Sequence, residues 1–151
     1  MINPQEIKTL ARERLEEAEI LFQNNKTDGA FYLAGYSVEL MLKAKICERL
    51  GIPNLFDESV TTIHGIGYVR KPFKTHDLFV LLIFSGLKVK FDIDKSSNKN
   101  LFKANSLLFG NWDEHCRYKP CGYMKAPDVQ QLLNLLKDPN DGLLQWIEQS
   151  Q

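Results

Sequence analysis

Apolar residues near the N-terminus recur at three- and four-residue spacing, which is the period of an amphipathic helix. Charged residues fill most of the positions between them. Asn3, Pro4 and Glu6 suit the first positions of a helix, because an Asn side chain can accept a hydrogen bond from an otherwise unpaired backbone N–H. The pattern therefore predicts a first helix from about Pro4 to the Asn-Asn-Lys sequence at 24–26. Its apolar positions are Ile7, Leu10, Ala11, Leu15, Ala18, Leu21 and Phe22.

The next helix is predicted to begin at Thr27 or Asp28 and to end at Leu50, where Gly51 can adopt the left-handed conformation that often follows a helix. Its apolar residues lie nearly all round, which is typical of a helix buried on several sides. Small side chains within it would allow neighbouring helices to approach closely. We expect this helix to be central, with the small residues Ala30, Ala34, Gly35 and Ala44 at its contacts.

Shorter helices are predicted in the second half of the chain. Thr75 can cap a helix over 76–86, and the sequence at 98–110 has the pattern of another. Pro127 is placed to open a further helix, and a last turn or two is expected over 143–147. The apolar positions of the helix at Pro127 are Val129, Leu132, Leu133 and Leu136.

Two segments do not have a helical pattern. Residues 51–74 mix glycine, proline and β-branched residues, which indicates a long, partly ordered loop. Residues 88–94 alternate charged and apolar side chains (Val89, Phe91, Ile93), as in a half-buried strand, but nothing is predicted to pair with them. We therefore expect an extended connection there. The predicted fold is all-α, an antiparallel up-and-down bundle of about five helices in a single domain over 1–151.

Composition narrows the class of protein. A chain of 151 residues that is 44% hydrophobic can bury one sizeable core, and its formal net charge of zero offers no global attraction to nucleic acid. Three cysteines do not form a complete disulfide framework, and the N-terminus has no signal-peptide pattern, so a cytoplasmic protein is expected. The longest apolar run, at 78–84, is too short to span a bilayer. No membrane partner is expected.

Basic residues are nevertheless concentrated between positions 70 and 103, where eight Lys and Arg face three acids, a difference of five positive charges. Such a cluster has the electrostatic character of a weak RNA contact. Tyr68 and Phe73 could add stacking surfaces. The candidate contact residues are Arg70, Lys71, Lys74, Lys88 and Lys90.

Residues 111–118 combine aromatic, acidic and metal-ligating side chains. His115, Cys116 and Cys121 are possible zinc ligands, but zinc sites need three or four ligands, and a fourth is missing. Cys47 is expected within the second helix, and His64 in the loop. We expect no metal and no cofactor.

Three motifs occur in a characteristic order: AFYLAGYSVELMLKAKICERLG at 30–51, KTHDL at 74–78 and NWDEHCRY at 111–118. In this order they resemble the HEPN family of small helical domains. The resemblance implies an antiparallel helical bundle that dimerises. It also implies a setting among RNases, toxin–antitoxin or phage-defence pairs, or minimal nucleotidyltransferases, so that a homodimer with a nucleotidyltransferase or antitoxin partner is expected.

Family members that cut RNA carry Arg followed, after four to six residues, by His. Arg117 has no histidine downstream, and the only formal match, Arg70 with His76, lies at the entrance to the third predicted helix. We therefore predict a non-catalytic interaction module. The alternative is a metal-independent RNase that uses Arg117 and His115 or, less favoured, Arg70 and His76. A purely structural interaction domain is the further alternative.

Glu39 lies within the most apolar helix, and a buried carboxylate must be paired or neutralised. Lys43 follows four residues later and can form an intrahelical pair. The resemblance favours a second partner, Arg117, which would fix a polar pocket. That pocket would contain Glu39, Lys43, Arg117, Tyr118, Trp112 and Tyr36, with Trp112 and Tyr118 anchored in the core and His115 in solvent.

Overall fold

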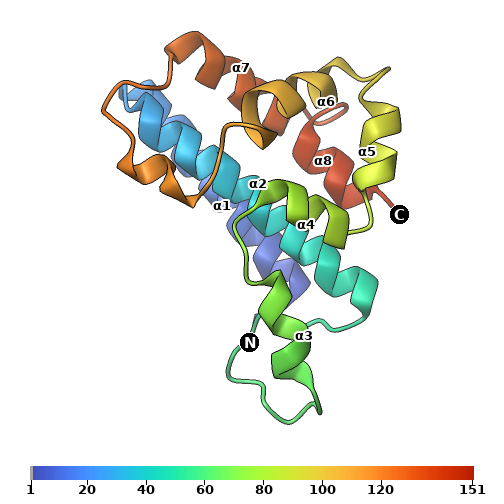
Figure 1. Ribbon diagram of the computed structural model, residues 1–151. Coiled ribbons are helices and arrows are strands. Elements are labelled where there is room, and N and C mark those ends of the chain that lie inside the picture. The colour runs from blue at the N-terminus through green and yellow to red at the C-terminus, as the bar shows by residue number, and fades with distance from the viewer. Residues whose placement is uncertain (1) are drawn as a thin grey trace.

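Two long antiparallel helices, α1 (Pro4–Gln23) and α2 (Thr27–Leu50), form the spine of the computed structural model, which describes residues 2–151 (Figure 1). Asn3 Oδ1 accepts a hydrogen bond from the Glu6 N–H at 3.0 Å, and the Glu6 carboxylate accepts one from the Asn3 N–H at 3.2 Å. This reciprocal cap confirms the predicted start of α1. Gly51 ends α2 in the left-handed conformation, with φ of 68°, as predicted.

The second helix is the centre of the fold. It packs against α1, α4 (Leu78–Phe84), α7 (Ala126–Lys137) and α8 (Leu143–Gln149). Its small residues Ala30, Ala34 and Ala44 are fully buried, so the backbones of neighbouring helices can approach them. The prediction of a central second helix is confirmed.

In Figure 1, α7 and α8 lie above and to the right of the α1–α2 pair, and α4 lies in front of it. Helix α6 (Lys99–Ala104) runs into a π-helix, η1 (Asn105–Phe109), and packs against α7. All described residues outside turns and loops are helical, which confirms the all-α class, although there are eight α-helices instead of about five. Within residues 2–151, no helix is both long and apolar enough to cross a bilayer.

The segment at 51–74 is more ordered than predicted, because it contains α3 (Ile66–Phe73). The buried Arg70 side chain donates hydrogen bonds to the backbone carbonyls of Leu55, Asp57 and Val60, and so ties the preceding turns to this helix. The sequence pattern missed α3 because it is only eight residues long and contains Pro72 near its end. In Figure 1, α3 projects away from the body of the bundle.

The segment at 88–94 is a helix, α5 (Lys88–Asp94), so the prediction of an extended connection was wrong. Leu87 and Phe91, four residues apart, are both fully buried, whereas Val89 and Ile93 are 73% and 65% exposed. Alternation at period two had placed Phe91 on one face with Val89 and Ile93. The helix places Phe91 on the opposite side, and ion pairs at i,i+4 (Lys88–Asp92 and Lys90–Asp94) support it.

Lys45 joins α2 to the C-terminal residues. Its ammonium is buried and donates to the backbone carbonyls of Glu148 and Ser150 at 3.0 and 2.8 Å. We expect Lys45→Met to lower the free energy of unfolding by about 1.5–3 kcal/mol, the usual contribution of a charged hydrogen bond. Chemical denaturation measures this, with Lys119→Met on an exposed lysine as the control. Equal stability of the two variants would contradict the role assigned to Lys45.

Candidate functional site

Glu39 is the centre of a polar cluster on α2. Its side chain is only 1% exposed, and a carboxylate so deeply buried must have charged or hydrogen-bonding partners. Lys43 Nζ donates to Glu39 Oε1 at 2.7 Å, and His76 Nδ1 lies 3.0 Å from each carboxylate oxygen. The predicted Glu39–Lys43 pair is therefore formed. The second partner, however, is His76.

His76 connects three elements of the fold. It precedes α4, whose first turn is capped by Asp77, with the Val80 N–H donating to Asp77 Oδ1 at 3.1 Å. With Nδ1 facing Glu39, His76 Nε2 faces Glu114 in the 3-10 helix η2 (Glu114–Tyr118), 3.5 Å from its Oε2. The sequence did not identify Glu114. The signal available for His76 was its place in the KTHDL motif together with the unmet need of Glu39 for a second partner.

Arg117 does not pair with Glu39, which corrects the prediction. Its guanidinium is exposed and lies over the ring of Tyr118, with Cζ 5.1 Å from the ring centroid. The Tyr118 hydroxyl, and after it that of Tyr32, raises the pKa of Arg117 above its ordinary value through hydrogen bonding and charge interaction. Tyr118 is 74% exposed, so the prediction that it is anchored in the core was wrong. The short 3-10 turn directs Cys116 inward instead.

Trp112 is buried, as predicted, and it fixes the start of this segment on α2. Its indole Nε1 donates to the Tyr32 carbonyl at 3.0 Å, and its ring lies tilted against the Tyr32 ring with centroids 5.9 Å apart. A Cβ atom at Gly35 would lie 2.2 Å from Trp112 Nε1. The absence of a side chain at Gly35 therefore makes room for the indole.

Tyr36 extends the aromatic row toward Glu39. Its ring stacks with that of Tyr32 at a centroid separation of 6.5 Å. Burial raises the pKa of the Tyr36 hydroxyl, and the Glu39 carboxylate raises it further. The residues of the predicted pocket therefore separate into two groups. Glu39 is buried on α2 beside the partly buried Lys43 and Tyr36, whereas Arg117 and Tyr118 are exposed on η2.

The two Arg–His pairs considered for RNA cleavage have different environments. Arg70 is buried and its Nε and Nη2 groups donate to backbone carbonyls, so it is placed neither for phosphate contact nor for catalysis beside His76. His115 is exposed, as predicted, with its Nε2 3.8 Å from Glu114 Oε1. Of the two histidines, His76 is the one held in a defined orientation, because it contacts Glu39.

Ion pairs neutralise much of the basic segment at 70–103. Lys74 pairs with Glu58, Lys88 with Asp92, and Lys90 with Asp94. Hydrogen bonds from Lys88 and Lys90 hold the pKa of Asp92 and of Asp94, respectively, below the usual range of a carboxyl group. Lys71 is exposed and has no ion-pair partner among residues 2–151. Four of the five predicted RNA-contact residues are therefore already occupied within the chain.

The cysteines are in separate environments. Cys47 is buried, and burial raises the pKa of its thiol to about 11. Cys116 is buried with Sγ 3.6 Å from the Asn111 carbonyl, whereas Cys121 is exposed. The part of the chain that the structure describes contains no group of three His, Cys, Asp or Glu side chains arranged to hold a metal ion.

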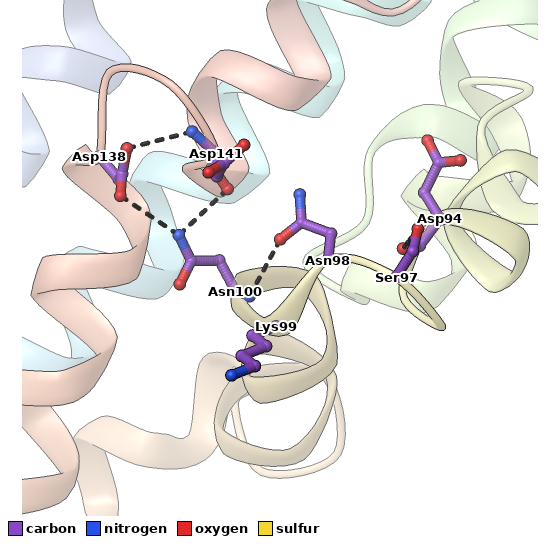
Figure 2. A pocket seen from close by; sticks show the side chains of 7 residues that line it. All are labelled: Asp94, Ser97, Asn98, Lys99, Asn100, Asp138 and Asp141. Atoms are coloured by element: carbon purple, nitrogen blue, oxygen red, sulfur yellow. Dashed lines mark hydrogen bonds between the residues drawn. The ribbon is translucent and has the colours of Figure 1, made fainter.

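A polar hollow of about 640 Å³ lies where α5, α6 and the α7–α8 connection meet (Figure 2). Two of its three carboxylates serve local structure. Asp138 accepts hydrogen bonds from the Asn140 and Asp141 N–H groups, and Asp94 accepts from Lys90 and Trp146. These contacts account for the Asp94 and Asp138 carboxylates. The hollow is lined by Asp94, Ser97, Asn98, Lys99, Asn100, Asp138 and Asp141.

No protein-family model, no curated protein and no solved structure matches this chain.

Proposed function

We propose that the protein is a HEPN-like, homodimeric interaction module of the cytoplasm, non-catalytic, with a nucleotide- or RNA-related role in a toxin–antitoxin or defence system. An antitoxin or a nucleotidyltransferase would be its partner protein. The observation that carries the dimer is an apolar groove between α1 and α2. The family setting comes from the order of the three sequence motifs.

The groove is a hollow of about 370 Å³ between the two longest helices, and apolar side chains predominate in its lining. Leu10 is 41% exposed there and shares the groove with the partly buried Leu33 and Leu40, so the three leucines form one apolar patch. Two antiparallel helices that expose leucines along one face can pair with a second copy across a twofold axis, giving a four-helix seam. The lining residues are Leu10, Arg14, Tyr32, Leu33, Tyr36 and Leu40.

The polar cluster borders this groove. Tyr36 and Leu40 line the groove, and Glu39 lies between them in the chain. A second copy seated in the groove would therefore lie next to the Glu39–His76 contact and next to Tyr32. This arrangement supports a dimer whose two polar clusters lie beside its seam.

Leu40→Glu is expected to convert a dimer into a monomer, because it would place a carboxylate in the apolar seam of each subunit. Light scattering at low micromolar concentration measures the mass, which should be twice that of the chain for the unmodified protein. Ile20→Glu is the matched control, since Ile20 is a 59% exposed apolar residue on α1 that does not line the groove. A monomeric unmodified protein, or a Leu40→Glu dimer, would show that the groove is not the seam.

The Glu39–His76 contact favours one second candidate, a metal-independent RNase. A carboxylate that holds one imidazole nitrogen orients the other for proton transfer, as in many acid–base sites. Under the main proposal, purified protein leaves RNA intact. Cutting that is lost in His76→Ala would establish this second candidate, and cutting that is lost in His115→Ala would instead establish the exposed Arg117 and His115 pair.

A further inference from the structure

An exposed aromatic side chain and a guanidinium form a stacked pair at the end of η2. Tyr118 is 74% exposed, and the Arg117 Cζ lies 5.1 Å from its ring centroid. A tyrosine ring with this exposed fraction gains little free energy from apolar burial. It offers a flat surface on which another planar group can stack, and the neighbouring guanidinium offers both stacking and charge.

In the described part of the chain, the basic residues around this pair lack ion-pair partners, whereas the acidic residues have partners. Arg117 and Lys119 form no ion pair within residues 2–151, and both are exposed. The acids of the same segment are engaged elsewhere, because Asp113 caps η2 by accepting from the His115 N–H at 2.7 Å and Glu114 faces His76. The available charge beside Tyr118 is therefore positive.

The surface is also held firmly in place. Trp112 and Cys116 are buried on the inner side of the same segment. The Asp28 carboxylate on α2 accepts hydrogen bonds from the Gly122 and Met124 N–H groups, which fixes the residues that follow. A preformed surface loses less conformational entropy on binding than a flexible loop does.

We infer that the surface formed by Arg117, Tyr118 and Lys119 binds single-stranded nucleic acid. An unpaired base stacks on the Tyr118 ring, and the two cations contact the phosphates on either side of it. A double helix would not suit the surface, since its bases are stacked on one another and unavailable. This assignment rests on the RNA-related role proposed above and gives it a location other than the basic segment at 70–103, but it does not require a dimer.

The test uses an end-labelled oligouridine of about twelve nucleotides, a length within the usual site size of such proteins. Fluorescence anisotropy at low salt should show binding that Tyr118→Ala weakens by about tenfold, which corresponds to the loss of one stacked base. Tyr118→Phe should retain the affinity. Arg117→Ala should reduce the salt dependence by roughly 0.7 log units per log unit of salt, as expected for one lost phosphate contact on a single strand.

Tyr68→Ala is the matched control, because Tyr68 is a 90% exposed tyrosine in α3, beside the basic residues Arg70 and Lys71. It should bind like the unmodified protein, as should Lys71→Ser. Thermal melting should be unchanged in Tyr118→Ala, so a loss of binding there cannot be assigned to unfolding.

Several results would overturn this inference. They are the absence of binding at low salt, equal binding by Tyr118→Ala and the unmodified protein, loss of binding in Tyr68→Ala or Lys71→Ser, and equal or tighter binding of a duplex of the same length. The oligomeric state is measured separately on Leu40→Glu. If that monomer still binds oligouridine, the nucleic-acid surface does not depend on the dimer. If the unmodified protein is a dimer but does not bind oligouridine, this inference is wrong and the proposed dimer is unaffected.

Discussion

Gly35→Ala is expected to lower the free energy of unfolding by about 3–5 kcal/mol, the cost of losing a buried aromatic side chain from its site. A Cβ atom at this position would lie 2.2 to 2.3 Å from three atoms of the Trp112 indole, far inside contact distance. Both Gly35 and Tyr32 belong to the rigid α2 helix, so the indole has to move. It would then lose its burial and its hydrogen bond to the Tyr32 carbonyl.

Urea denaturation of Gly35→Ala and of Gly67→Ala checks this expectation. A Cβ atom at Gly67 in α3 meets nothing within 4 Å, so the control should match the unmodified protein or gain up to about 1 kcal/mol. Trp112→Leu should be destabilising by itself. Combined with Gly35→Ala, however, it should add much less than the sum of the two, because both act on the same contact. Additive effects would show that Gly35 and Trp112 are independent.

Lys43→Met is expected to cost about 3 kcal/mol, at the lower end of the range for removing one partner of a buried ion pair. Glu39 would keep its buried carboxylate but would have only His76 left to compensate its charge. Because the His76 contact remains, we expect a loss of stability at the lower end of that range. The Met side chain has about the length of the lysine stem, so little packing is lost.

A double-mutant cycle separates the pair from other effects of the substitution. Glu39→Leu in the Lys43→Met background should recover part of the lost stability, since no charge is then left buried. Arg117→Ala is the control, and its effect should stay within about 0.5 kcal/mol because its guanidinium is exposed. A large loss in Arg117→Ala that Glu39→Gln softens would instead restore the Glu39–Arg117 pair that the resemblance favours.

Local signals accounted for the long helices. The Asn3 and Glu6 side chains cap α1 through residues three apart in the chain, and Gly51 ends α2 through its own backbone conformation. Such features depend on neighbours in sequence, so they can be read from it. Period-two alternation at Val89 and Ile93 led to the wrong prediction of an extended segment. A seven-residue segment is too short for periodicity alone to separate helix from strand.

The sequence by itself determined that the chain is helical, that α2 is central, and that Glu39 has to be paired, since burying a carboxylate without a partner costs too much free energy. Only the tertiary structure decided which partner it has. His76 is 37 residues from Glu39 and reaches it because α4 packs on α2, whereas the short η2 turn directs Arg117 into solvent beside Tyr118. Contacts between distant residues depend on how whole helices pack, and no local pattern in the chain specifies that packing.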